Sequence, residues 1–178
     1  NRSIMSTLKV NNLDTQTGSN IVVASGKVLS AAGHIIQTVI GSKFTTQQQS
    51  TSTSYADVVS LAITPKFSSS VIKVCFYYNV SGNHAIRLVR DSTTVFQPTS
   101  TYLNYDADSY GQTSHVSDST RRTIAMSYID SPASTSAITY KWQVASYNAG
   151  NGTGLMFNEL TATTASAYTY MEIMEIAQ

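Results

Sequence analysis

Residues 71–80 read Val-Ile-Lys-Val-Cys-Phe-Tyr-Tyr-Asn-Val, a run in which bulky apolar side chains recur at every second position. Successive side chains of a β-strand point to opposite faces of a sheet, so this period predicts a strand rather than a helix. The set expected to face the core is Ile72, Val74, Phe76, Tyr78 and Val80. Cys75 then lies on the less apolar face.

The same alternation recurs in residues 137–147, whose bulky set is Ile138, Tyr140, Trp142, Val144 and Ser146. Trp142 is the residue that we expect most firmly in the core. Across the chain, the predicted buried residues include Phe76, Tyr78, Ile86, Leu88, Ile124, Trp142 and Val144.

Other segments rich in Val, Ile, Thr and Tyr have a similar period. They are residues 34–40, 55–64, 85–91, 94–97, 122–129, 155–158 and 168–176. Clusters of turn-forming residues separate most of them, such as Asp91-Ser92. Eight or nine strands at this spacing predict an all-β chain, folded as an antiparallel β-sandwich or a barrel.

The composition agrees with a strand-rich fold built around one core. The chain has 178 residues, of which 42% are hydrophobic and 12% charged, about half of the roughly 25% usual in soluble domains. Hydroxyls replace the missing charges, since the sequence contains 26 serines and 23 threonines. This balance favours short strands and turns.

Two polar regions interrupt the strand pattern. Residues 1–29 contain only weak strand signals, at residues 7–10 and 21–23, and too few large apolar side chains for a core of their own. We therefore predict an extended N-terminal attachment arm over residues 1–32 and a β-sandwich domain over residues 33–178. Residues 45–54, which consist entirely of Gln, Ser and Thr, are expected to form a long surface loop or hinge.

Charge and hydropathy exclude several classes of protein. Eleven basic and ten acidic residues give a net charge of +1, and Arg121-Arg122 is the only adjacent basic pair, so we expect no nucleic-acid partner. Apolar runs of a few residues, such as residues 21–24, predict no membrane insertion. No signal peptide is recognisable. The single cysteine, Cys75, rules out an intrachain disulfide.

The sequence offers little for metal or cofactor binding. The three histidines His34, His84 and His115 lie in separate segments without metal-ligand spacing, and phosphate-loop and nucleophile-elbow motifs are absent. Residues 104–108 resemble the opening of a calcium loop, but Ser109 stands where that loop needs Gly, and His115 where it needs Glu. We therefore predict no metal and no cofactor.

Catalytic carboxylates are also scarce. Glycoside hydrolysis needs a pair of carboxylates at a set separation, which sequence does not fix. The candidates for such a pair are Asp130, Glu159, Glu172 and Glu175. With only ten acidic residues in the chain, the prediction is that the protein is not an enzyme.

Residues 98–119 have no strand pattern, and aperiodic segments of this length in compact domains are often functional. Tyrosines interleaved with polar side chains suit adaptable recognition of a sugar or a protein surface. Alternatively, the rings pack against a neighbouring subunit or cover the end of the domain. The candidate binding residues are Tyr102, Asn104, Tyr105, Asp106, Asp108, Tyr110 and His115.

Segments along nearly the whole chain carry a family resemblance. They include Ser6-Thr7-Leu8-Lys9-Val10-Asn11, Gly33-His34-Ile35-Ile36-Gln37, Thr139-Tyr140-Lys141-Trp142-Gln143-Val144 and Met171-Glu172-Ile173-Met174-Glu175-Ile176. The chain resembles virion proteins of tailed bacteriophages, especially tail-fibre-like and head-decoration proteins of marine and cyanobacterial phages. The resemblance implies a homotrimeric virion component with a jelly-roll sandwich. Its arm would bind other virion proteins of the capsid or tail.

Three functions follow as hypotheses. The first is a short fibre or knob that exposes the β-sandwich for host attachment, with a host-surface glycan or protein as partner. The second is a capsid decoration or cement protein that stabilises the head. The third, from another class, is a carbohydrate-binding module.

Overall fold

The computed structural model describes residues 31–41, 48–50, 52–81, 84–97, 122–146, 155–157 and 169–178. Within these ranges the chain is all-β and contains no helix. The strands are β1 (Ile35–Ile40), β2 (Gln48–Ser50), β3 (Ala56–Ile63), β4 (Val71–Ser81), β5 (His84–Arg90), β6 (Thr93–Phe96), β7 (Arg122–Asp130), β8 (Ile138–Ser146), β9 (Leu155–Phe157) and β10 (Tyr170–Ile176). No helix long and apolar enough to cross a membrane occurs in this described part.

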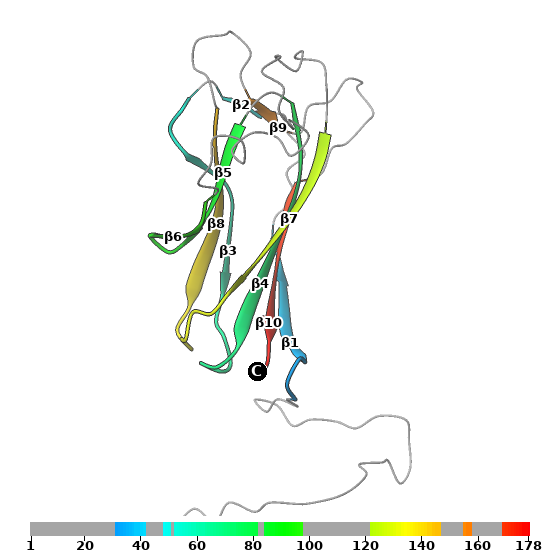
Figure 1. Ribbon diagram of the computed structural model, residues 1–178, viewed down its shortest axis with the longest axis vertical. Helices are drawn as coiled ribbons and strands as arrows, with labels where there is room; N and C mark the ends of the chain where they lie inside the picture. Colours follow the sequence, from blue (N-terminus) through cyan, green and yellow to red (C-terminus); the bar gives the residue numbers. More distant parts are fainter. Residues whose placement is uncertain are drawn as a thin grey trace, which may run out of the picture.

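The strands form two antiparallel sheets that pack against each other in a β-sandwich-like arrangement (Figure 1). The six-stranded sheet has the order β1-β10-β4-β9-β2, with β7 paired to the other edge of β4. The four-stranded sheet has the order β3-β8-β5-β6. Neighbouring strands are therefore mostly distant in sequence: β10, for example, lies between β1 and β4.

The chain crosses repeatedly from one sheet to the other. β1 belongs to the six-stranded sheet, β3 to the four-stranded sheet, β4 to the six-stranded sheet, and β5 and β6 again to the four-stranded sheet. β7, β8 and β10 continue this exchange. Most contacts that hold the fold are consequently long-range, which ties the two sheets into one unit.

The core lies between the sheets and is built from the predicted alternating sets. The ring of Phe76 on β4 stacks on that of Trp142 on β8, with centroids 5.2 Å apart, and so bridges the two sheets. Phe76, Tyr78, Ile86, Leu88, Trp142 and Val144 are buried, as predicted. The predicted burial of Ile124, Val80 and Ser146 concerns side chains outside the described set.

The strand predictions were confirmed to within two residues at each end, with one error. Gln48–Ser50 was expected to belong to a loop but forms β2, which pairs with Leu155–Phe157 of β9. A ladder uses backbone donors and acceptors, so a polar segment can join a sheet without an alternating apolar pattern.

The turn at Asp91 was expected from its composition and has the backbone that such a turn needs. Asp91 has φ of +54°, in the left-handed region that Asp tolerates better than most residues. Its N–H donates to the carbonyl of Thr139 at 2.7 Å, and its Oδ1 accepts from the Thr139 N–H at 2.9 Å. This reciprocal pair ties the end of β5 to β8.

Candidate functional site

The predicted binding residues, Tyr102, Asn104, Tyr105, Asp106, Asp108, Tyr110 and His115, lie outside the described residues, as do residues 1–30 of the predicted arm. Both therefore stay predictions. The described strands instead present two outward faces of contrasting chemistry and two buried carboxylates, Asp130 and Glu175. The sequence analysis had named the two carboxylates only as candidate catalytic acids, and neither face as a site.

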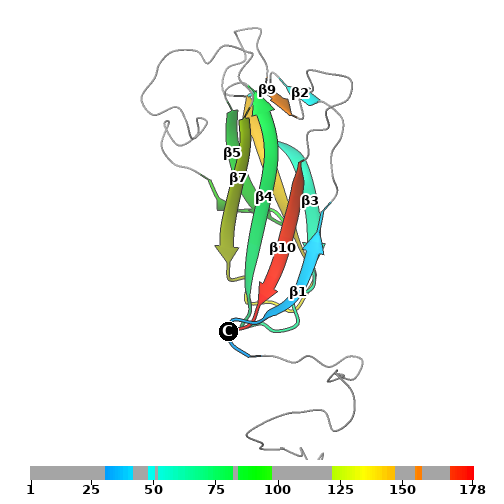
Figure 2. The same cartoon turned by 90° about the vertical axis from the view of Figure 1, so that its right-hand side faces the viewer.

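The outward side of the six-stranded sheet is largely apolar over its four long strands, β7, β4, β10 and β1, which lie side by side in Figure 2. Residues paired across an antiparallel ladder point to the same side, so the register defines this surface. We call it the apolar face; its apolar members are Ile35, Ile40, Val71, Cys75, Tyr77, Ala125, Ile129, Tyr170, Met174 and Ile176.

Three isoleucines on the apolar face are more exposed than is usual for this residue. Ile35, Ile40 and Ile129 expose 58%, 69% and 59% of their surface. They are the large hydrophobic side chains that stand out as exposed among the described residues, and all three belong to this one surface. They lie on its two outer strands, β1 and β7, with the other apolar members between them, and a contiguous apolar surface of this kind marks an interaction surface.

Two opposite charges lie within the apolar face. Glu172 on β10 is paired with Cys75 on β4, and Lys73 precedes Cys75 by two residues on the same side. Burial raises the pKa of the Cys75 thiol more than the neighbouring Lys73 ammonium lowers it, so the net pKa lies above its usual value. The rings of Tyr77 and Tyr170 stack beside this group, with centroids 4.6 Å apart.

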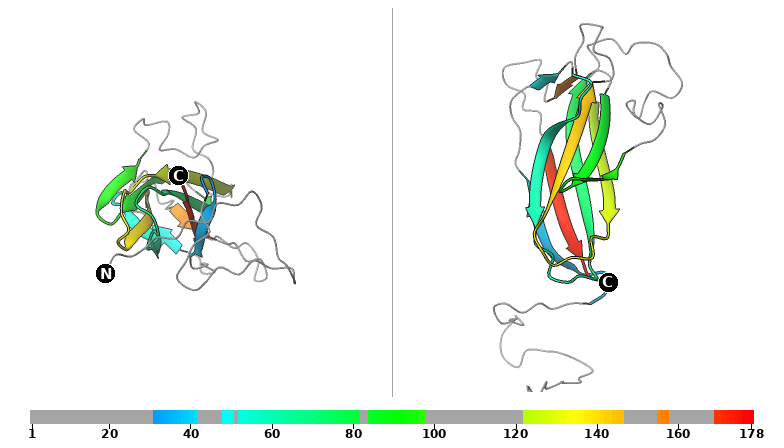
Figure 3. Two further views of the ribbon diagram at one scale, coloured as in Figure 1. Left: turned by 90° about the horizontal axis from the view of Figure 1, so that it is seen from below. Right: turned by 90° about the vertical axis from the view of Figure 1, so that its left-hand side faces the viewer.

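The outward side of the four-stranded sheet, seen in the right panel of Figure 3, is polar instead. Gln143 on β8 accepts from Arg87 Nε of β5 and donates to Asp57 Oδ1 of β3. Lys141 Nζ lies 3.4 Å from Asp57 Oδ2, and the Arg87 guanidinium stacks 4.2 Å above the Tyr55 ring. We call this row of five residues the polar face.

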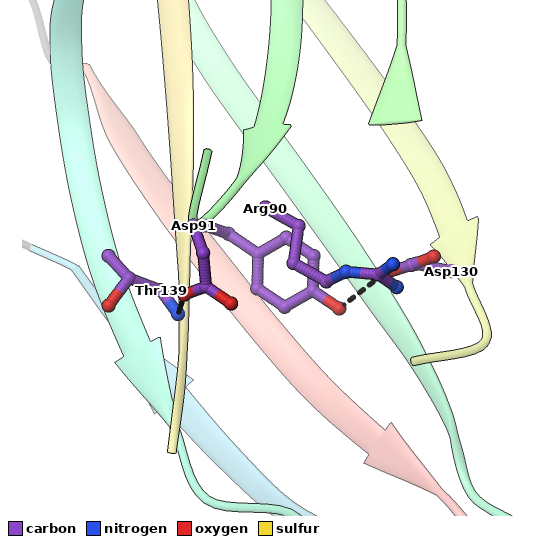
Figure 4. A network of polar contacts seen from close by, with 5 residues as sticks. Arg90, Asp91, Asp130 and Thr139 are labelled. Carbon is purple, nitrogen blue, oxygen red and sulfur yellow. Dashed lines mark hydrogen bonds and ion pairs between the residues drawn. The ribbon is translucent and has the colours of Figure 1, made fainter. Parts of the chain in front are cut away.

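Between the sheets, Asp130 at the end of β7 meets two residues of the other sheet. Arg90 Nη1 and the Tyr140 hydroxyl both donate to Asp130 Oδ2, each at 2.7 Å. Figure 4 shows Arg90 and Asp130 directed toward each other, with Asp91 beside Thr139 nearby. Burial raises the pKa of Tyr140, and its hydrogen bond to Asp130 raises it further.

Glu175 points inward from β10 and is completely buried. Its Oε1 accepts hydrogen bonds from the N–H groups of Lys66 and Phe67 at 2.8 and 3.1 Å, and from Ser70 Oγ at 2.8 Å. Its Oε2 accepts from Gln37 Nε2 at 2.6 Å. Burial raises the pKa of Glu175, but these four donors lower it more, and the net pKa is below its usual range.

The structure does not pair the acidic residues considered for glycoside hydrolysis. Glu172 and Glu175 point to opposite sides of β10, as their burial and register show. Asp130 and Glu175 are each enclosed by their own donors. Glu159 lies outside the described residues.

Comparison of the sequence with protein-family models and with curated proteins finds no match for this chain.

Proposed function

We propose that this chain is a non-enzymatic structural component of a tailed-phage particle, in which residues 1–32 mount a β-sandwich of jelly-roll type. The strand order carries this proposal. The long strands follow the orders β1-β10-β4-β7 and β3-β8-β5-β6, with the chain crossing between sheets as two Greek keys require. Eight-stranded jelly rolls recur in viral capsid and lectin domains.

Within the particle the chain forms a short fibre or knob, is a homotrimer and takes part in host attachment. The resemblance of its segments to virion proteins supports this role. The apolar face supports assembly into an oligomer, because so much exposed apolar surface on one sheet is typical of subunit contacts. Recognition is assigned to residues 98–119, whose tyrosines suit a glycan or protein surface.

The decisive experiment locates the chain in particles. Mass spectrometry of purified phage should find the chain, and antibodies raised against it should label the tail in electron micrographs. Label on the head would favour the capsid decoration or cement protein. Absence of the chain from purified particles would contradict a virion role altogether.

The attachment role has its own test in the variant Tyr102→Ser/Tyr105→Ser/Tyr110→Ser. Particles carrying this variant should assemble normally but adsorb to host cells more slowly. The control is Ser68→Ala/Ser69→Ala, which changes two exposed serines in the connection between β3 and β4. Normal adsorption and normal assembly of the tyrosine variant would contradict a function for residues 98–119.

A second candidate function, carbohydrate binding, is favoured by the polar face. Tyr55, Asp57, Arg87 and Gln143 place an aromatic ring beside amide, carboxylate and guanidinium groups on an outward surface. A glycan array decides this reading: an isolated module should bind a defined sugar, and Gln143→Ala should weaken that binding.

A further inference from the structure

We propose that the apolar face is the contact surface between copies of this chain. The proposal deepens the proposed function, since it rests on the homo-oligomer and names the surface that forms it. In the ribbon views no described strand covers this side of the six-stranded sheet (Figures 1 and 2). Its occupant is a second copy, for reasons of composition, area and charge.

The composition of the apolar face matches that of subunit interfaces. Interfaces of homo-oligomers are richer in apolar, aromatic and methionine side chains than the rest of a surface, and poorer in charge. Here Tyr77, Tyr170 and Met174 lie near the centre, exposed isoleucines flank them, and the described outward residues include one lysine and one glutamate. The polar face of the other sheet has the opposite character and serves as an internal comparison.

The area is large enough for a specific contact with another sheet. Four strands about 4.8 Å apart and seven residues long at about 3.3 Å each cover roughly 450 Å². Two such faces in contact bury on the order of 1,000 Å² in total, because side chains that project from each sheet add to its flat area. This total reaches the lower bound for specific interfaces. A single extended segment is one strand wide and covers about a quarter of this breadth, so another sheet fits better than an arm.

The charges make the face complementary to itself. Glu172 of β10 is paired with Cys75 of β4, and Lys73 lies two residues from Cys75 along β4, so the two charges are diagonal neighbours on the two central strands of the face. A second copy brings the same pair, so Lys73 of one copy meets Glu172 of the other in a two-fold contact. In a three-fold ring, which the proposed homotrimer requires, Lys73 of each copy meets Glu172 of the next copy around the axis.

The test uses two charge reversals in the full chain. Lys73→Glu places two carboxylates on the face, and Glu172→Lys places two ammonium groups there. Each variant should repel its own copies and raise the dissociation constant of the oligomer about tenfold or more, whereas the double variant Lys73→Glu/Glu172→Lys, in which the two charges exchange places, should assemble like wild type. Native mass spectrometry and light scattering measure the masses of the assemblies.

The matched control is Lys141→Glu, the same reversal on the polar face, which should leave the oligomer intact. Fluorescence of Trp142 verifies that each variant is folded. If a reversal fails to fold, Ile129→Lys replaces it, because that side chain is already 59% exposed in the folded chain and tolerates a charge. Its control is Ala62→Lys, at an exposed position on the other sheet.

Each outcome decides between explanations. Wild-type chain that is monomeric at micromolar concentration overturns both the interface and the homo-oligomer, even if particles contain the chain. An oligomer that persists in both reversals overturns only the interface, because the copies then meet elsewhere. Single reversals that dissociate the oligomer without recovery in the double variant show that Lys73 and Glu172 do not meet between copies, and also overturn the proposal.

Discussion

Asp130 and Glu175 are two inward-facing carboxylates whose negative charges are compensated by different kinds of hydrogen-bond donor. Asp130 is 9% exposed and meets a cation, the Arg90 guanidinium, together with the Tyr140 hydroxyl. Glu175 is fully buried and meets four neutral donors, two of which are backbone N–H groups of the β3–β4 connection. Each carboxylate joins parts of the fold that are far apart in sequence.

The difference shows what each carboxylate depends on. The charge of Asp130 is compensated by the Arg90 side chain, which is itself 27% exposed, so water also solvates this ion pair. Glu175 is balanced by fixed dipoles, and these exist only while Lys66 and Phe67 keep their backbone conformation. We infer that Glu175 organises the β3–β4 connection, whereas Asp130 fastens two strands that are already formed.

The largest expected effect is that of Glu175→Leu. It leaves four donors without an acceptor in the interior, and we expect the free energy of unfolding to fall by about 3–5 kcal/mol. Urea unfolding followed by circular dichroism measures it. The control Glu172→Leu, on the outward side of the same strand, should change stability by less than about 1 kcal/mol. Equal losses in both variants would show that the buried donors do not depend on Glu175.

Arg90→Met should destabilise the chain less, by about 2 kcal/mol. It leaves Asp130 with only the Tyr140 hydroxyl, but the partial exposure of the pair lets water replace some of the lost interaction. The double variant Arg90→Met/Asp130→Asn should recover part of the loss, because the uncompensated charge is removed. If the double variant loses the full sum of both single effects, the two residues do not act as a pair.

Tyr140→Phe removes one donor to Asp130 and should cost about 1 kcal/mol, since Arg90 remains. The same variant tests the role of the Tyr140 hydroxyl at high pH. The pKa of Tyr140 is raised in the folded chain, so its contribution is fully present below the ordinary tyrosine pKa and is lost as the pH rises through the folded value. The phenylalanine variant should therefore lose less stability than wild type in alkaline urea titrations.

The smallest expected effect is the loss of unfolding free energy in mild acid, which we attribute to protonation of Glu175. Its pKa is lowered in the folded chain, so its contribution is fully present above the ordinary glutamate pKa and is lost as the pH falls through the folded value. Unfolding free energies measured at neutral pH and at successively lower pH should decline less steeply in Glu175→Gln than in wild type. Identical slopes would mean that Glu175 is not the group protonated on acid unfolding.

Much of the strand framework could be predicted from the sequence, because a period of two directly reports which side chains share a face. Residues 71–78 and 138–144 obey that period, and their inward members are the core. β2 could not be predicted in this way: its Gln-Gln-Ser segment carries no alternation and joins the sheet through backbone pairing with β9.

The buried carboxylates show why sites were harder to predict than strands. In residues 170–176 the inward set includes Glu175, which a hydropathy pattern assigns to the surface, and its donors Gln37 and Ser70 are 138 and 105 residues away. Only the antiparallel pairing of β10 with β1 and β4 brings them together. The one available signal was a glutamate at an inward position of an alternating strand.

The position of Trp142 makes its intrinsic fluorescence a probe of the core. It is the single tryptophan, it is fully buried, and its indole N–H has no hydrogen-bond partner among the described residues. Its ring also contacts Phe76 of the opposite sheet. Separation of the two sheets would admit water to an otherwise dry chromophore and shift its emission to longer wavelength, so one spectroscopic signal follows the opening of the whole core without any label.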